Sequence, residues 1–246
     1  IIKETEKNWR FVFESPLYDK IDFVAGQLVQ IHANIPGEDL PVVRNYSVAS
    51  WPDGTNKFEL IVTYLEGGKM SEYLFDFIQV GDEILYKGPM GIFTLPQDLT
   101  QRDVIFVSTG SGVSPFRSMI NYIYENQVPF KSIKLYFGTR RTEDIVYKGE
   151  FEYLEKELDN FDYIPVLSRE KDTGFKEKYY YIDWPMLEFL NKSEHFLQFM
   201  SLYNLASPIL SLLTPIFILI VPFFIIKMKG LELTVNEYIE VYPICK

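Results

Sequence analysis

The chain has 246 residues, of which 47% are hydrophobic and 24% charged, so a packed core is expected and disorder is not. Its net charge of −10 would repel a polyanion, which argues against nucleic-acid binding. The single cysteine, Cys245, excludes an intrachain disulfide framework, and the two histidines lack metal-ligand spacing, so no metal site is expected. No signal peptide is expected from the first residues, and the missing Met indicates a fragment or a trimmed chain.

The first part of the chain, residues 1–98, has the pattern of short strands separated by turns. Apolar and polar residues alternate in the first two expected strands, and turn residues such as Gly26 and Gly81 precede strands. One short helix is expected over residues 71–77. This pattern predicts a small antiparallel barrel. The expected strands are residues 9–13, 27–32, 57–64 and 82–86.

The pattern changes at about residue 99, where buried apolar strands begin to alternate with amphipathic helices. Residues 104–107 are continuously apolar, as in a strand of a parallel sheet. Pro115 then opens a helix whose apolar residues recur with helical spacing on one face. Further strands are expected at 133–137 and 163–167, with a helix at 150–158 between them. We therefore predict a partial parallel-sheet α/β domain over residues 99–172.

The last part of the chain, residues 173–246, does not continue this alternation and remains unassigned. Within it, residues 205–226 are uncharged and long enough to cross a bilayer, which needs about 20 apolar residues. Three interpretations stay open. In the first, the apolar segment is a membrane anchor, straight or bent at Pro215. In the second, it is a buried part of the α/β domain. In the third, the whole tail is foreign to this fold.

The motif "RNYS" at residues 44–47 combines three residue types suited to a nucleotide. The planar guanidinium of Arg44 matches a phosphate, and the face of Tyr46 can stack on a ring system. The hydroxyl of Ser47 can bond the edge of a heterocycle. The alternative is an edge strand with a surface arginine and a half-buried tyrosine.

Two glycine-rich turns are candidates for holding phosphates. The first is "GGKMS" at residues 67–71, where glycines permit close approach and a helix begins; the alternative is a plain turn capped by Ser71. The second is "STGSGVSP" at residues 108–115, which lies between an expected strand and an expected helix. Its proline takes the place of the third glycine of a dinucleotide fingerprint and suits a first helical turn.

Arginines follow two of the strands expected in the α/β domain. Ser168 and Arg169 come directly after the strand at 163–167, at the sheet edge where such domains bind ligands. An arginine there can pair with a ribose 2′-phosphate. Arg140 and Arg141, after the preceding strand, are rival candidates, and solvated loop charges are the alternative for all of them.

The motifs "RNYS", "GGKMS", "KGPMGIF", "STGSGVSPF" and "YFGTRRTEDIVY" occur in an order that resembles the ferredoxin–NADP reductase family over residues 1–170. The resemblance is closest to bacterial reductases that supply ferredoxins or oxygenases. It implies a cytoplasmic oxidoreductase with an FAD-binding barrel and an NAD(P)H-binding α/β domain. Its electron acceptor would be a ferredoxin, an oxygenase component or a small molecule.

The resemblance also implies roles for individual residues. Tyr46 and Ser47 would lie against the reactive flavin ring, and Arg44 would bind the flavin phosphate. Ser168 and Arg169 would grip a 2′-phosphate, which favours NADPH over NADH. The remaining cofactor-binding positions would be Val48, Gly68, Lys69, Met70 and Ser71 for FAD, and Thr109, Gly110, Gly112, Pro115 and Arg140 for the nicotinamide dinucleotide.

The tail departs from the family pattern. The family's final strand ends in a Cys-Gly-Pro motif near the nicotinamide, and Cys245 has no following Gly-Pro. The tail loosely resembles a segment of giant-virus proteins, which raises the possibility of a chimeric chain. The alternative function is therefore a membrane-anchored flavin-binding protein without reductase turnover.

Overall fold

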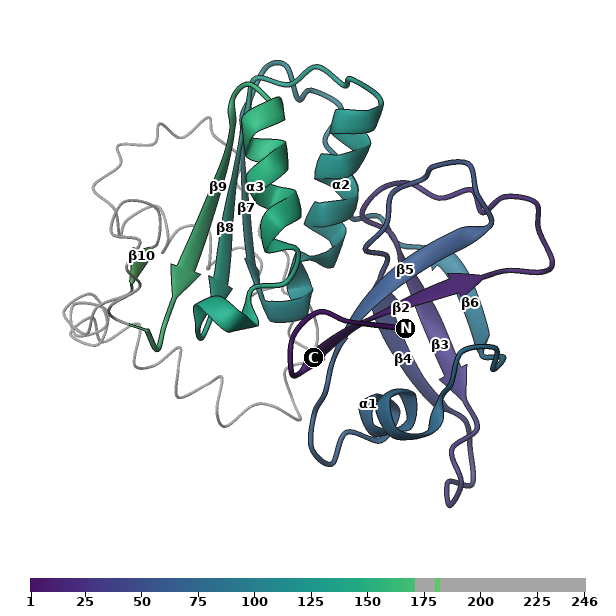
Figure 1. Cartoon of the computed structure of the whole chain (residues 1–246). Helices are drawn as coiled ribbons and strands as arrows, with labels where there is room; N and C mark the ends of the chain where they lie inside the picture. The colour runs from purple at the N-terminus through teal and green to yellow at the C-terminus, as the bar shows by residue number, and fades with distance from the viewer. Residues whose placement is uncertain (171–179, 182–246) are drawn as a thin grey trace, which may run out of the picture.

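Buried and partly buried residues alternate along residues 28–33, so that one face packs into the barrel core, whereas residues 58–62 are buried on both faces. In the computed structural model, which describes residues 1–170 and 180–181, the N-terminal strands pair into two three-stranded antiparallel sheets. The sheet orders are β1-β2-β5 and β4-β3-β6 (Figure 1). The strands are β1 Ile2–Lys3, β2 Asn8–Glu14, β3 Leu28–Ala33, β4 Val42–Ser47, β5 Lys57–Thr63 and β6 Leu85–Met90.

A short helical segment closes one end of this barrel. It consists of α1, Lys69–Glu72, continued by one π-helical stretch, η1, Tyr73–Phe77, in agreement with the helix predicted over 71–77. Met70 and Leu74 point into the barrel core, where they pack with buried strand residues such as Phe11 and Leu60. Burial of these two side chains therefore fixes the segment against the sheets.

Strand β6 differs from its predicted position at residues 82–86, because it begins only at Leu85. A turn occupies the residues before it. The Gln79 N–H donates to Oδ2 of Asp82 at 2.8 Å, and the Asp82 N–H donates to the Gln79 carbonyl at 3.1 Å. Asp82 thus ends the turn instead of starting the strand, as aspartates commonly do.

The second half of the described chain forms a parallel sheet of order β10-β9-β8-β7, with helices α2 and α3 on one face (Figure 1). The sequence predicted three of these strands, and the two-residue β10 adds a fourth beside β9. The elements are β7 Asp103–Thr109, η2 Gly110–Val113, α2 Ser114–Glu125, β8 Ser132–Thr139, η3 Thr142–Asp144, α3 Lys148–Glu157, β9 Phe161–Leu167 and β10 Tyr180–Tyr181.

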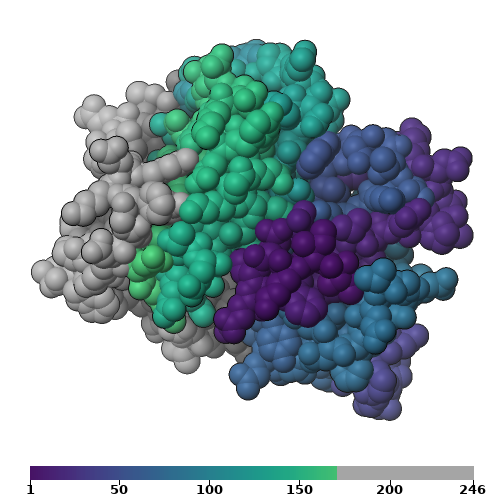
Figure 2. All heavy atoms as spheres, viewed as in Figure 1, coloured from purple at the N-terminus to yellow at the C-terminus, as the bar shows by residue number. Residues whose placement is uncertain are grey.

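Helix α2 lies between the parallel sheet and the barrel, and the two domains share part of one core (Figure 1). Ala25, Ala49 and Ile61 of the barrel are buried in the same hydrophobic cluster as Phe116 and Met119 of α2. Figure 2 shows the N-terminal residues lying along the junction of the two domains. The antiparallel sheets followed by a parallel sheet confirm the predicted fold class.

The domain boundaries at residues 98 and 172 stay predictions. The apolar segment at 205–226 lies outside the described residues. Over residues 1–170 and 180–181, the structure contains no helix with the length and hydropathy required to span a membrane.

Candidate cofactor-binding site

The flavin motif predicted at residues 44–47 lies on β4, which among the described strands pairs only with β3. Alternation along the strand places Arg44 and Tyr46 on the same face. Arg44 is exposed, and its Nη1 donates to the carbonyl oxygen of Val43 at 2.8 Å. Ser47 is half-buried, whereas Val48 is fully buried and its N–H donates to the carbonyl oxygen of Gln27 at 2.9 Å, so this structure presents no surface of Val48 to a ligand.

Tyr46 is suited to present a neutral ring. Burial raises the pKa of its phenol to about 12, although the positive charge of Arg44 partly opposes the shift. The phenol therefore stays protonated across the physiological range, and its half-buried ring is held by the sheet. This arrangement fits a stacking platform for a flat heterocycle.

The glycine-rich turn at residues 67–71 is brought beside the flavin motif, because α1 contacts β4. A Cβ on Gly68 would lie only 2.8 Å from the carbonyl oxygen of Leu65 and 2.7 Å from Oγ of Ser71. The Ser71 hydroxyl closes the turn. It accepts a hydrogen bond from the Leu65 N–H at 3.1 Å and donates one to the Gly68 carbonyl oxygen at 2.9 Å. Only glycine fits this cradle, and the serine hydroxyl is used within it.

The other two residues of this turn also direct their side chains away from a phosphate. Met70 is buried in the barrel core, and Nζ of Lys69 pairs with Oε2 of Glu38 at 2.7 Å. Backbone N–H groups in the first turn of a helix have no acceptor within the helix. The turn therefore fits a pyrophosphate through main-chain donors and not through side chains.

The second glycine-rich turn connects β7 to α2 at the carboxyl edge of the parallel sheet. Thr109 is exposed, and Gly110 adopts a left-handed backbone with φ +54°. The Ser114 hydroxyl donates to the Ser111 carbonyl at 2.7 Å and so stabilises the entry into α2, whose first turn contains Pro115. Gly110 and Gly112 both remain partly accessible. The turn thus presents main-chain groups at a helix N-terminus, as a dinucleotide site requires.

The ends of β8 and β9 lie next to this turn and bring two candidate arginines together. The Ser168 N–H donates to the Thr139 carbonyl at 3.0 Å, and the Arg169 N–H donates to the Arg140 carbonyl at 2.9 Å. Arg140 and Arg169 are both exposed, and neither forms an ion pair with another described residue. Two arginines that emerge from adjacent strands are suited to an anion such as a 2′-phosphate.

The rival candidate Arg141 differs from these two arginines. Its Nη1 pairs with Oε1 of Glu143 at 3.3 Å, and its main-chain N–H donates to Oδ2 of Asp144 at 3.2 Å. The structure therefore leaves Arg140 and Arg169 better placed than Arg141 for a phosphate.

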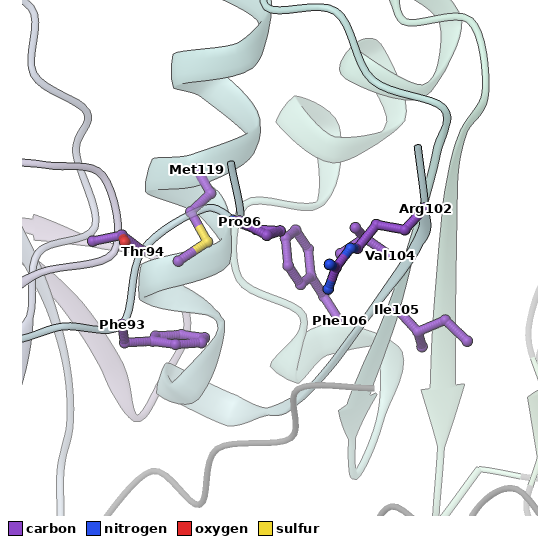
Figure 3. Close-up of a pocket in the computed structure, with 8 residues that line it drawn as sticks. All are labelled: Phe93, Thr94, Pro96, Arg102, Val104, Ile105, Phe106 and Met119. Atoms are coloured by element: carbon purple, nitrogen blue, oxygen red, sulfur yellow. The ribbon is translucent and has the colours of Figure 1, made fainter. Parts of the chain in front are cut away.

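A small cavity lies between the segment that joins the domains, at residues 93–96, and elements β7 and α2 of the α/β domain (Figure 3). Its volume of about 20 Å³ has room for roughly one water molecule and excludes a dinucleotide. This cavity therefore holds neither of the two expected cofactors. The lining residues are Phe93, Thr94, Pro96, Arg102, Val104, Ile105, Phe106 and Met119.

One buried ionic cluster at the domain junction was missed in the sequence. It centres on Arg117 of α2 and Glu59 of β5, both less than 10% exposed. Glu59 interrupts an otherwise apolar strand, and Arg117 flanks the apolar stripe of α2. Buried charges are usually paired, so a charged residue in each of these apolar segments was the available sign of a buried ion pair. Pairing across the junction could not be inferred from either segment alone.

Comparison with known proteins matches both domains of the chain. The profile of the "Oxidoreductase FAD-binding domain" matches residues 2–95, and that of the "Oxidoreductase NAD-binding domain" matches residues 106–200. The second match runs past the boundary expected at residue 172. Ferredoxin–NADP reductase B of Sorangium cellulosum is 40% identical over 147 residues, which are 60% of this chain and 58% of that protein. The chain belongs to the ferredoxin–NADP reductase family.

Members of this family with other electron-transfer roles are also similar to the chain. The reductase component of propane 2-monooxygenase from Mycolicibacterium smegmatis is 34% identical over 153 residues, 62% of this chain and 42% of that protein. A ferredoxin NADP⁺ reductase from Neisseria gonorrhoeae, solved with FAD and NADP, superposes with a TM-score of 0.61 at 25% identity, covering 79% of this chain and 75% of that one. The chain thus spans about half the length of the curated relatives that it matches.

Proposed function

We propose that the chain is an NAD(P)H-dependent flavin oxidoreductase that passes electrons to a ferredoxin, an oxygenase component or another acceptor. The observation that carries the proposal is the convergence of both cofactor motifs on the domain junction. Arg117, in the helix that follows the dinucleotide turn, donates to the carbonyl oxygen of Ala49 at 3.0 Å. Ala49 lies two residues beyond Ser47 of the flavin motif. Two bound cofactors would therefore meet at this junction.

On the barrel side, FAD would supply the redox chemistry, since it accepts a hydride and releases electrons singly or in pairs. Tyr46 would offer its neutral ring as a stacking surface, and the Ser47 hydroxyl would bond the edge of the ring. The exposed guanidinium of Arg44 is free to turn from the Val43 carbonyl to a phosphate. The main chain at residues 68–71 would complete this half of the site.

On the α/β side, main-chain groups of the turn from Thr109 to Pro115 would hold the pyrophosphate of the nicotinamide dinucleotide. Arg140, Ser168 and Arg169 lie together at the same sheet edge, as a 2′-phosphate would require. This grouping supports NADPH over NADH.

The acceptor and the location are inferred from the relatives. A ferredoxin–NADP reductase and an oxygenase reductase component are both similar to this chain, which supports a protein acceptor of either kind. We place the protein in the cytoplasm, where NADPH is supplied. The relatives named as reductases favour this function over a membrane-anchored flavin-binding protein without turnover. Membrane association through residues 205–226 stays a hypothesis about a segment outside the described residues.

Flavin uptake by the purified chain tests the first half of the proposal. We expect bound FAD with resolved flavin absorbance bands. Arg44→Ala should weaken FAD binding by roughly tenfold to a hundredfold, the range for loss of a hydrogen bond to a charged group. Lys57→Ala, which removes a positive charge elsewhere on the barrel where Lys57 pairs with Glu14, is the control and should bind FAD normally. A chain that takes up no added FAD would refute the proposal.

A further inference from the structure

Arg117 of α2 joins the two domains through a single buried guanidinium. Its side chain is 6% exposed. Within the α/β domain, Nε and Nη2 donate to the two carboxylate oxygens of Glu150 at 2.7 and 2.8 Å. Toward the barrel, Nη1 donates to Oε1 of Glu59 at 2.7 Å and to the Ala49 carbonyl at 3.0 Å. The planar fork of arginine therefore contacts both domains at once, which a lysine ammonium cannot reproduce.

Glu59 is held from both sides of the junction as well. The Tyr147 hydroxyl of the α/β domain donates to Oε1 of Glu59 at 2.8 Å, and Nη1 of Arg10 lies 3.3 Å from Oε2. Burial and the charge of Glu59 raise the pKa of Tyr147, so its hydroxyl remains a donor. The guanidinium carbon of Arg117 lies 4.1 Å from the centre of the Tyr147 ring.

The backbone conformation at Tyr147 also indicates that the contacts across the domain junction fix its geometry. Its φ of +56° lies in the left-handed region, which is unfavourable for a residue with a large side chain. The surrounding contacts must hold it there, among them the Tyr147 N–H that donates to Oε2 of Glu4 at 3.4 Å. Such strain is typical of positions where a defined geometry matters.

Two positive and three negative groups meet in this cluster: Arg10 and Arg117, against Glu4, Glu59 and Glu150. Although burial alone would lower the pKa of Arg117, its hydrogen bond to Glu150 and the charges of Glu150 and Glu59 raise it, so it remains charged. Buried ion pairs add little net stability relative to well-packed apolar residues. A gain in defined geometry explains their presence at the junction better than a gain in stability.

The cluster is connected directly to both cofactor motifs. Ala49, two residues beyond Ser47, donates its N–H to the Glu59 carbonyl at 2.7 Å, and the Glu59 N–H donates to Oγ of Ser50 at 3.0 Å. The segment after the flavin motif is thus tied to β5. Arg117 lies two residues beyond Pro115 in the helix that follows the dinucleotide turn. The Arg117 side chain therefore links the main chain that follows the flavin motif to the helix that follows the dinucleotide turn.

We infer that Arg117, together with Glu59 and Tyr147, is a positioning group that sets the distance between the two cofactor rings. The inference rests on the proposed function. Arg117 acts through the backbone at Ala49 and through α2, and its contacts lie within the protein. Hydride transfer requires reacting atoms about 3–3.5 Å apart, and a displacement of about 1 Å can slow it roughly a hundredfold. A clamp formed by Arg117, Glu59 and Tyr147, between the segment after the flavin motif and the helix after the dinucleotide turn, is suited to hold that distance.

Arg117→Lys tests the clamp because it keeps the charge and removes the fork. In the FAD-loaded full chain, we expect flavin reduction at saturating NADPH to slow by roughly tenfold to a hundredfold. The dissociation constant for FAD should remain within about threefold of that of the wild type, because no FAD-binding residue is altered. Asn121→Ala is the matched control. Asn121 is buried on the same helix and donates to Glu150 at 2.6 Å, but it has no hydrogen bond to the barrel. The Asn121→Ala substitution should lower the stability of the protein and leave the rate of flavin reduction within about twofold of that of the wild type.

Hydrogen exchange without cofactor gives a readout that does not depend on activity. Backbone amides of residues 48–50 should exchange faster in Arg117→Lys than in the wild type. In Asn121→Ala their exchange rates should equal those of the wild type. Tyr147→Phe removes only one hydrogen bond across the junction. It covers the case in which Arg117→Lys fails to fold, with an expected slowing of reduction of roughly threefold to tenfold.

The outcomes separate this inference from the proposed function. If NADPH does not reduce the flavin of the wild type, the proposed function fails, while the exchange measurement still reports on the clamp. If the wild type is reduced and both Arg117→Lys and Tyr147→Phe are reduced equally fast, Arg117 is not a positioning residue. Unchanged exchange at residues 48–50 in both variants would overturn the clamp itself.

Discussion

Gly26 offers a direct test of how the domains pack. It lies in the turn before β3, with a backbone φ of +102°. A Cβ at this position would lie 2.3 Å from the carbonyl oxygen of Phe93 and 2.3 Å from Cε of Met119. The methionine end can move, but the Phe93 carbonyl belongs to the backbone that joins the domains. Gly26→Ala should therefore displace the contact between the barrel, the joining segment and α2.

The cost of Gly26→Ala has two parts. An alanine with positive φ costs about 1–2 kcal/mol, and forcing an extra carbon into a packed region costs roughly 1–3 kcal/mol more. Gly54→Ala isolates the first part, because Gly54 has a φ of +79° and nothing lies within 4 Å of its Cβ position. We expect Gly26→Ala to lower the free energy of unfolding by about 2–5 kcal/mol and Gly54→Ala by about 1–2 kcal/mol.

Urea unfolding followed by tryptophan fluorescence measures both variants against the wild type. The difference between the two variants, about 1–3 kcal/mol, is the contribution of the junction. If Gly26→Ala costs no more than Gly54→Ala, then the barrel turn, the joining segment and α2 do not pack as the structure describes.

Three further predictions concern the cofactor edge and pH. Arg169→Ala should lower kcat/KM for NADPH relative to NADH by roughly tenfold or more, whereas Arg141→Ala should not; equal effects of the two would contradict the assignment. Gly138→Val should weaken NADP⁺ binding in a titration by roughly tenfold, because a Cβ there would lie 3.0 Å from Cγ2 of Thr109. Gly149→Ala, with open space around its Cβ position, should bind normally, and equal affinities would argue against a site at Thr109. The pKa of Tyr46 is raised from 10.0 to about 12, so its contribution to stability is fully present below pH 10 and is lost as pH rises to about 12. Tyr46→Phe should flatten this alkaline loss in unfolding measurements, leaving the part due to Tyr147, and an unchanged slope would contradict a buried, protonated Tyr46.

Local signals explain which parts of the fold were predictable. The helix over 71–77 and the start of α2 were predicted because glycine, proline and apolar spacing act on the backbone within a few residues. Strand β6 was misplaced because the turn formed by Gln79 and Asp82 depends on two specific hydrogen bonds. The short strand β10 had no periodic pattern of its own.

The site shows the same division. Arg44 and the two glycine-rich turns were selected from residue type and from position between elements. The partner of Arg117 was not, since Glu59 is 58 residues away and meets it only when the domains dock. In β5 nearly every residue is buried, so no alternation marks the face that receives the other domain.

The central claim is that the chain transfers electrons from NAD(P)H to bound FAD. Anaerobic mixing of the FAD-loaded chain with NADPH, followed by flavin absorbance in a stopped-flow instrument, tests it directly. We predict that the flavin absorbance falls at a rate that saturates with NADPH concentration. A chain that binds FAD but shows no change in flavin absorbance with either NADPH or NADH would contradict the account.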